Sequence, residues 1–274
     1  MKSVAIAQPQ LIGHIADASA GTFRLGDQLV GCGLIDDDDP PFDPHDAAFS
    51  GLVLLRKRAF SCNYRDRAII RLLAGATLAN EQADEVPFGY VGSEFVADVL
   101  AIGPNVTTLT VGDRVIGDNS YPVARGDAQP GVVTNEASAR YEVLPEHKLL
   151  RVPTDMPDDV AAGFSLGAQT AYAMIRKARL QPGALVLLTA ARSNTALFLA
   201  QALRHQHTVY GLTSRPEQAE TLRELGFRHL LPVDYGLRTL LPDELLREWA
   251  GRFDGVFDPF IDVHWHPVSR LLSQ

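Results

Sequence analysis

The first half of the chain alternates short apolar runs with turn-forming residues. Turns such as Gly103-Pro104-Asn105 separate the runs. Short strands at close spacing, with Gly, Pro and Asn between them, are typical of a small β-barrel or sandwich. The pattern predicts strands over residues 51–60, 95–102, 114–117, 141–144 and 149–152.

The pattern changes after Pro153, where strands begin to alternate with helices. The strands are uniformly apolar, which is typical of a parallel sheet covered on both faces. In such a sheet the first β-turn-α unit is where the phosphates of a dinucleotide bind. We predict strands over 184–189, 208–212, 229–233 and 255–257, and helices over 155–178, 195–205, 217–225 and 243–250.

Composition and charge argue against several classes of protein. The chain is 46% hydrophobic with a formal net charge of −8, which argues against nucleic-acid binding. No apolar run approaches the roughly 20 residues that span a membrane, and the first residues lack the apolar core of a signal peptide. Two cysteines, Cys32 and Cys62, cannot form a disulfide framework. We therefore expect a cytoplasmic protein that acts on a small molecule.

Several motifs occur in an order that resembles one family, the medium-chain dehydrogenase/reductase superfamily. They are GSEFVADVLAIGPNVTTLTVGDRVIG over 92–117, NYRD over 63–66, AQTAY over 168–172, PGALVLLT over 182–189 and EQAETLRELG over 217–226. The second motif resembles its quinone and enoyl reductase branches. The resemblance implies an α/β protein: a GroES-like β-barrel domain over 1–152, a Rossmann domain with a doubly wound parallel sheet over 153–274, and an active site in the cleft between them.

The positions of the zinc ligands differ from those of the alcohol dehydrogenase branch. That branch has a Cys three residues before the motif aspartate and a His before the motif glutamate; here these positions hold Asn63 and Ser93. Neither is a ligand that a catalytic zinc site uses. Cys62 lies one position away from the expected ligand. We expect no catalytic metal.

Without a Lewis acid, the favoured reaction is reduction of an already polarised double bond or quinone. On this interpretation Asn63 orients the substrate carbonyl, and Tyr64 donates a hydrogen bond or a proton. The alternative is that Tyr64 only packs, because many relatives have Phe there.

The expected phosphate-binding loop contains no glycine. Its sequence is AARSNTA over 190–196. Ala196 can pack the helix on the strand, Asn194 tolerates left-handed backbone angles, and Ser193, Asn194 and Thr195 can cap the helix or donate to phosphate. Arg192 adds positive charge. The alternative is that cofactor binding has been lost and only the fold kept.

The end of the second Rossmann strand indicates the cofactor. NAD sites usually carry an acid there, whereas NADP sites offer a cation. Here Ser214 and Arg215 suit a 2′-phosphate, so NADPH is the expected cofactor, although Arg215 could simply be exposed on a turn before Pro216. Thr170, in the motif that resembles the helix under the nicotinamide, is the remaining expected contact.

The chain ends sooner than the family pattern predicts. Further strands would complete the sheet, and they often pair across a homodimer. We therefore expect either a C-terminally truncated fragment or a naturally shortened relative. Two functions remain open: an NADPH-dependent, zinc-free reductase of an enone, enoyl group or quinone, or a non-catalytic reductase-like binding or scaffold protein.

Overall fold

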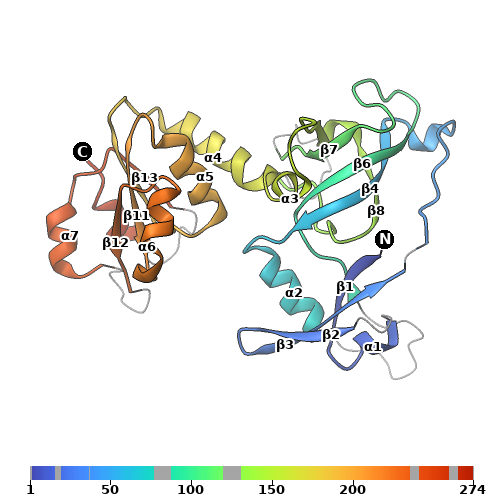
Figure 1. The fold of residues 1–274 in the computed structure, drawn as a ribbon, viewed down its shortest axis with the longest axis horizontal. Coiled ribbons are helices and arrows are strands. Elements are labelled where there is room, and N and C mark those ends of the chain that lie inside the picture. The colour runs from blue at the N-terminus through green and yellow to red at the C-terminus, as the bar shows by residue number, and fades with distance from the viewer. Residues whose placement is uncertain are drawn as a thin grey trace. The chain divides into compact units, whose positions relative to one another are not determined.

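The structure is a computed structural model that describes residues 2–15, 20–36, 38–76, 88–119, 131–234, 241–258 and 265–273. The chain forms two compact units, Met1–Leu166 and Gly167–Gln274 (Figure 1). The functional division predicted at residues 152 and 153 stays a prediction.

A five-stranded antiparallel sheet forms the centre of the first unit. Its strands lie in the order β8-β4-β6-β7-β9. Their bounds are β4 Leu52–Ser61, β6 Glu94–Ile102, β7 Arg114–Gly117, β8 Tyr141–Pro145 and β9 Leu149–Arg151. Alternate residues of β4, such as Val53 and Leu55, are fully buried, and they pack with Phe95 and Val99 of β6 in one apolar cluster. The five strands predicted from the sequence are confirmed.

A second sheet in the same unit was not predicted. It has four strands in the order β2-β3-β1-β5. Their bounds are β1 Ser3–Ala7, β2 Gly21–Leu25, β3 Gln28–Ile35 and β5 Phe88–Gly89. Helix α2, Asp66–Gly75, packs on this sheet through Ile69, Ile70, Leu73 and Ala74. The short elements of this unit are α1 Ile12–Ile15, η1 Ala47–Phe49 and η2 Glu146–Lys148.

The helix predicted over residues 155–178 is interrupted. It forms two helices, α3 Asp158–Ala162 and α4 Ser165–Ala178. Gly163 ends the first helix with φ −105° and ψ 9°, and its N–H donates a hydrogen bond to the Val160 carbonyl at 3.2 Å. Glycine is a poor residue for a helix interior, so the chain turns there before it continues.

The second unit contains a parallel sheet in the order β12-β11-β10-β13. The strands are β10 Leu185–Leu188, β11 Thr208–Thr213, β12 His229–Pro232 and β13 Gly255–Phe257, and the helices after α4 are α5 Asn194–Leu203, α6 Ala219–Glu224, α7 Asp243–Trp249 and α8 Trp265–Ser269, with η3 at Pro216–Gln218. Successive residues of β10 point to opposite faces. Val186 and Leu188 join one buried cluster, and Leu187 joins the other. The uniformly apolar strands therefore form a sheet covered on both sides, as predicted.

Candidate functional site

In the first unit, the candidate residues lie where β4 ends and β6 begins. These strands pair so that Ser61 lies opposite Glu94. Gly92, just before β6, has φ +96°, and a Cβ there would lie 3.0 Å from the Phe60 ring and 3.1 Å from the Ser61 carbonyl. A side chain at this position would be strained and crowded, so glycine allows the start of β6 to lie close to the end of β4.

The nitrogen atoms of Asn63 donate hydrogen bonds to buried side chains of the protein. Its Nδ2 donates to Glu94 Oε1 at 2.6 Å and to Ser93 Oγ at 3.3 Å. Its backbone N–H donates to Asp66 Oδ2 at 2.6 Å. Both amide hydrogens are thus committed to the protein, and Asn63 can offer a ligand only its Oδ1 acceptor without breaking these bonds.

Two buried carboxylates hold this loop. Glu94 is 1% exposed and accepts from Ser61 Oγ at 3.2 Å, Asn63 Nδ2, Ser165 Oγ at 3.4 Å and the Leu166 N–H at 2.6 Å. Buried carboxylates are stable only when they are paired or hydrogen-bonded. Glu94 meets this condition through donors from two segments, 61–63 and 165–166, so it ties both of them to β6.

Asp66, the second carboxylate, is fully buried at the start of α2. Besides the Asn63 N–H it accepts from Ser93 Oγ at 2.9 Å, and Arg65 Nη1 lies 3.5 Å from its other oxygen. From the sequence, Arg65 and Asp66 were expected to fix the loop through local hydrogen bonds and charge pairing, whereas Glu94 was assigned no role. For Glu94, the signal available in the sequence was an acidic residue at the edge of an apolar run.

Tyr64 is placed differently from Asn63. Its side chain is exposed, at 74%, and the Arg67 guanidinium lies 5.8 Å from its ring. Because the Arg67 N–H donates to the Tyr64 carbonyl at 3.2 Å, the backbone of Tyr64 belongs to the turn that starts α2. The Tyr64 side chain is therefore exposed to solvent, on a loop whose backbone is held by hydrogen bonds.

The two positions that carry zinc ligands in the alcohol dehydrogenase branch are brought together here, as Asn63 and Ser93, and hydrogen-bonded to each other. Among the described residues, no group of three or more His, Cys, Asp or Glu side chains is arranged to hold a metal ion. Cys62 is exposed as a residue, but burial around its sulfur, with the Asp66 carboxylate and the Cys32 thiol nearby, raises its pKa to about 11. At neutral pH it is therefore a protonated thiol, and not the thiolate that binds metal.

In the second unit, the strand order changes direction between β10 and β13, the first and fourth strands of this sheet. Thr189 and Asp258 follow these strands at their carboxyl ends. Thr189 is 3% exposed and donates through Oγ1 to Asp258 Oδ1 at 2.8 Å. Ligands of open α/β sheets bind at such a switch point, outside the carboxyl ends of the strands.

The loop after β10 forms its turn without any left-handed residue. Among the described residues, the only non-glycine positions with positive φ are Asn105 and Arg179. Ser193 instead caps α5: it has φ −73° and ψ 147°, and its Oγ accepts the Ala196 N–H at 3.2 Å. Asn194 is already the first residue of the helix, so its tolerance of left-handed angles is not used.

A glycine in the neighbouring strand makes room for this loop. A Cβ at Gly211 of β11 would lie 2.9 Å from the Ala191 Cβ and 2.7 Å from the Phe227 ring. Ala191 is fully buried, and Ala196 is 2% exposed at the start of α5. Small residues at 191 and 196, together with Gly211, therefore provide the close packing that a glycine inside the loop usually provides.

The charged candidates lie on two consecutive loops. Arg192 is exposed and lines a pocket of about 260 Å³ with Gln218, which lies three residues after Arg215. Ser214 and Arg215 are exposed after β11, and Arg215 pairs loosely with Glu217 at 3.7 Å. Exposed pairs of this kind contribute little, about 0–1 kcal/mol, so Arg215 can change partner easily.

The remaining candidates are on the helices. Thr195 is half-buried in the first turn of α5, and Thr170 is exposed on α4. Gly167, one turn before Thr170, packs against α5, because a Cβ there would lie 2.7 Å from the Phe198 ring and 3.1 Å from Asn194 Nδ2. Helix α4 therefore lies close to the start of helix α5.

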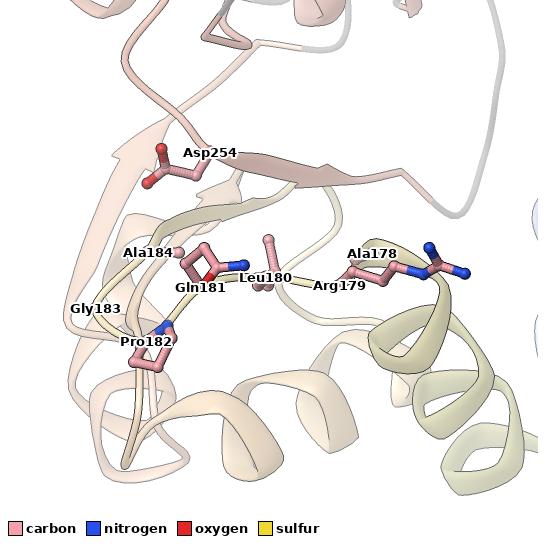
Figure 2. A pocket seen from close by; sticks show the side chains of 8 residues that line it. All are labelled: Ala178, Arg179, Leu180, Gln181, Pro182, Gly183, Ala184 and Asp254. Carbon is pink, nitrogen blue, oxygen red and sulfur yellow. The ribbon is translucent and has the colours of Figure 1, made fainter.

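A larger pocket, of about 380 Å³, lies at the opposite edge of this sheet (Figure 2). Its lining includes Ala184 and Asp254, which come immediately before β10 and β13. Figure 2 shows the Asp254 carboxylate and the Arg179 guanidinium pointing away from each other. Because the strands are parallel, this edge is the amino-terminal one, where dinucleotides do not bind.

None of the helices in the described ranges has the length and apolar character needed to cross a lipid bilayer.

Comparison with known proteins agrees with both halves of this description. Residues 50–154 match the model of the alcohol dehydrogenase GroES-like domain. A 2-haloacrylate reductase from a Burkholderia species is 32% identical over 205 residues, which are 73% of this chain and 55% of that protein. The chain thus spans about half the length of this curated relative.

Two solved structures share the fold over almost the whole chain. The quinone oxidoreductase of Pseudomonas syringae pv. tomato superposes with a TM-score of 0.66 at 21% identity, covering 99% of this chain and 70% of that one. A mycobacterial protein complexed with NADPH also gives a TM-score of 0.66 at 21% identity, covering 100% and 71%. With its GroES-like domain followed by a Rossmann-type sheet, the chain has the domain order and the fold of the medium-chain dehydrogenase/reductase superfamily.

Proposed function

We propose that this protein is an NADPH-dependent reductase of an electron-poor carbon–carbon double bond, or of a quinone. The observation that carries the proposal is the carboxyl edge of the second unit's sheet. There a capped helix start, Arg192 and the Ser214-Arg215 pair lie on the loops after β10 and β11. The 2-haloacrylate reductase, whose name denotes reduction of an acrylate, supports the substrate class.

The residues of the second unit fit a dinucleotide with a 2′-phosphate. Helix α5 starts behind the loop, and the amino end of a helix favours a negatively charged group. Residues 213–215 include no acid that would hold an unmodified ribose diol, and Arg215 offers a cation instead. We therefore assign the diphosphate to Arg192, Ser193, Asn194 and Thr195, the 2′-phosphate to Ser214 and Arg215, and a nicotinamide contact to Thr170.

The first unit supplies the proton. When bound, NADPH supplies the hydride that adds to the electron-poor carbon. Tyr64 is the outward donor, and its O–H stabilises and protonates the oxygen on which negative charge develops. Asn63 is a positioning residue in this scheme, because its amide hydrogens hold the loop to Glu94 and Ser93. No metal ligand takes part.

Cofactor titration tests the proposal. Purified full-length chain is titrated with NADPH and NADH by nucleotide fluorescence or calorimetry. We expect tighter binding of NADPH, and a loss of about ten-fold or more in Arg215→Ala for NADPH alone, since charge-assisted hydrogen bonds to phosphate are strong. Arg223→Ala, an exposed arginine on α6, is the matched control. Failure of the folded chain to bind either nucleotide would refute the reductase and favour a binding protein that has lost its cofactor.

Turnover then tests the proton donor. With an enone, a 2-haloacrylate and a quinone as substrates, Tyr64→Phe is expected to lower kcat by about 10²-fold while NADPH affinity stays unchanged. Unchanged kcat would show that Tyr64 is only an exposed loop residue.

A further inference from the structure

A pocket of about 360 Å³ in the first unit is lined by four cationic side chains and no acidic one. It lies between the start of β1, the second half of β4 and the segment before β8. The cationic residues are Lys2, Lys57, Arg58 and Arg140, and apolar side chains, including Val4, Phe60 and three alanines, line most of the remainder. Asn63, Tyr64 and Glu94 are not in its lining, so it is separate from the site described above.

Three of the four cations are paired with acids, beginning with the two lysines. Lys57, which is 4% exposed, forms an ion pair with Glu142 and lies 4.1 Å from the centre of the Phe95 ring. Burial lowers the pKa of Lys57, and the Glu142 carboxylate opposes that shift. Lys2 pairs with Asp36 at 3.1 Å, but Asp36 is largely exposed, so this pair is weak.

Arg58 belongs to a network in which cations outnumber acids. It lies 2.7 Å from Asp158 and 3.2 Å from Asp98. Arg56 also contacts Asp98, at 3.0 Å, and Arg114 contacts Asp158, at 2.6 Å. Three arginines thus share two aspartates next to the pocket, in a chain whose overall charge is negative.

Arg140 is the side chain that has no acid. Its Nε is buried without a hydrogen-bond partner, and its guanidinium stacks 4.6 Å from the Tyr141 ring. In the part of the chain that the structure describes, this guanidinium forms no ion pair. A buried donor without an acceptor destabilises the fold, more so when it is charged, and an oxyanion at the guanidinium would offset this effect.

We propose that this pocket binds a small organic anion, a carboxylate or phosphate group on a short apolar body. The Arg140 guanidinium binds the oxyanion, and Val4, Phe60 and the alanines surround the body. The volume lies at the lower end of the 300–1,000 Å³ that is usual for small-molecule sites. A guanidinium also matches both oxyanions geometrically, because its N–H groups bond them in pairs.

The experiment is an NMR titration of the ¹⁵N-labelled full chain with sodium hexanoate, with neutral hexanamide and with inorganic phosphate. We expect hexanoate to shift the amide signals of residues 137–140 saturably, and hexanamide to leave them in place. Arg140→Gln should weaken hexanoate at least ten-fold. Arg24→Gln, an exposed arginine on β2, is the control and should bind as the unaltered chain does.

Two further observations make the result decisive. Arg140→Lys keeps the charge and should retain part of the affinity even if Arg140→Gln unfolds. Tighter binding of hexanoate assigns the site to a carboxylate, and tighter binding of phosphate assigns it to a phosphate group. Equal shifts with hexanoate and hexanamide, or no saturable shift with either anion, would overturn the proposal.

Discussion

Glu94→Gln tests whether the buried carboxylate network holds the Asn63-Tyr64 loop. The carboxylate accepts four hydrogen bonds, two on each oxygen: Ser61 and Asn63 on Oε1, Ser165 and Leu166 on Oε2. A glutamine amide has the same shape, but one of its ends is a donor. Whichever way it is turned, its NH₂ group faces either the Asn63 amide or the Leu166 N–H.

The magnitude follows from these contacts. One end of the side chain loses its acceptor, and the other loses the charge that strengthens its bonds. Hydrogen bonds to a charged group contribute about 1.5–3 kcal/mol each, so losing the equivalent of two gives about 3–6 kcal/mol. For domains of about 150–250 residues, each kcal/mol lowers Tm by about 2–4 °C. We therefore expect Tm to fall by about 6–24 °C.

Circular dichroism melting measures the fall, and amide hydrogen exchange locates it. The Leu166 amide should exchange faster, whereas the Asn63 amide, which donates to Asp66, should change less. Glu136→Gln, an exposed glutamate in the same unit, is the control and should melt within 1–2 °C of the unaltered chain. A Tm for Glu94→Gln within that same range would refute the view that this carboxylate supports the loop.

Three other predictions follow from single contacts. Gly211→Ala places a Cβ 2.7 Å from the Phe227 ring. We therefore expect the free energy of unfolding, measured with urea, to fall by about 1–3 kcal/mol and NADPH binding to weaken. Unchanged values would show that the loop is not closely packed. Because the Cys62 pKa is raised to about 11, its alkylation by iodoacetamide should be slow at pH 7 and rise about ten-fold per pH unit up to pH 10; a plateau below pH 9 would contradict this. Partial burial alone would raise the pKa of Glu146, but N–H bonds from the 107–109 loop outweigh it and hold the pKa below the usual value. The stabilisation is therefore present above about pH 4.5 and lost as pH falls, so Glu146→Gln should be less stable than the unaltered chain at pH 7 and approach it at pH 3; a constant difference would contradict the assignment.

The pattern of apolar residues predicted most of the strands and helices because burial follows the period of each element. Burial alternates along the first part of β4, whereas β10 is apolar throughout, which distinguishes a sheet with one buried face from a sheet covered on both. The second sheet of the first unit, β2-β3-β1-β5, escaped prediction for the same reason. Strand β2 is exposed along almost its whole length, so its sequence carries no burial pattern, and it is defined only by pairing with β3.

For the candidate site, motif order alone indicated which positions matter. Asn63, Tyr64 and the 190–196 loop follow from residue types and spacing, and the absence of zinc ligands at 63 and 93 needs no structure to be seen. The orientation of the side chains within the site, in contrast, is visible only in the structure. Asn63 points its amide inward and Tyr64 is exposed, because of bonds to Glu94 and Asp66, which are distant in sequence.

Tertiary structure alone decided how the loop without glycine is accommodated and where the cationic pocket forms. The space for Ala191 comes from Gly211, on the adjacent strand. The pocket joins Lys2, Lys57 and Arg140, which meet because β1 and β4 both pack against the segment around Arg140. A sequence specifies local periodicity through residues that are near neighbours. Close packing and uncompensated charge depend on residues that only the folded chain brings together, so they became visible only in the structure.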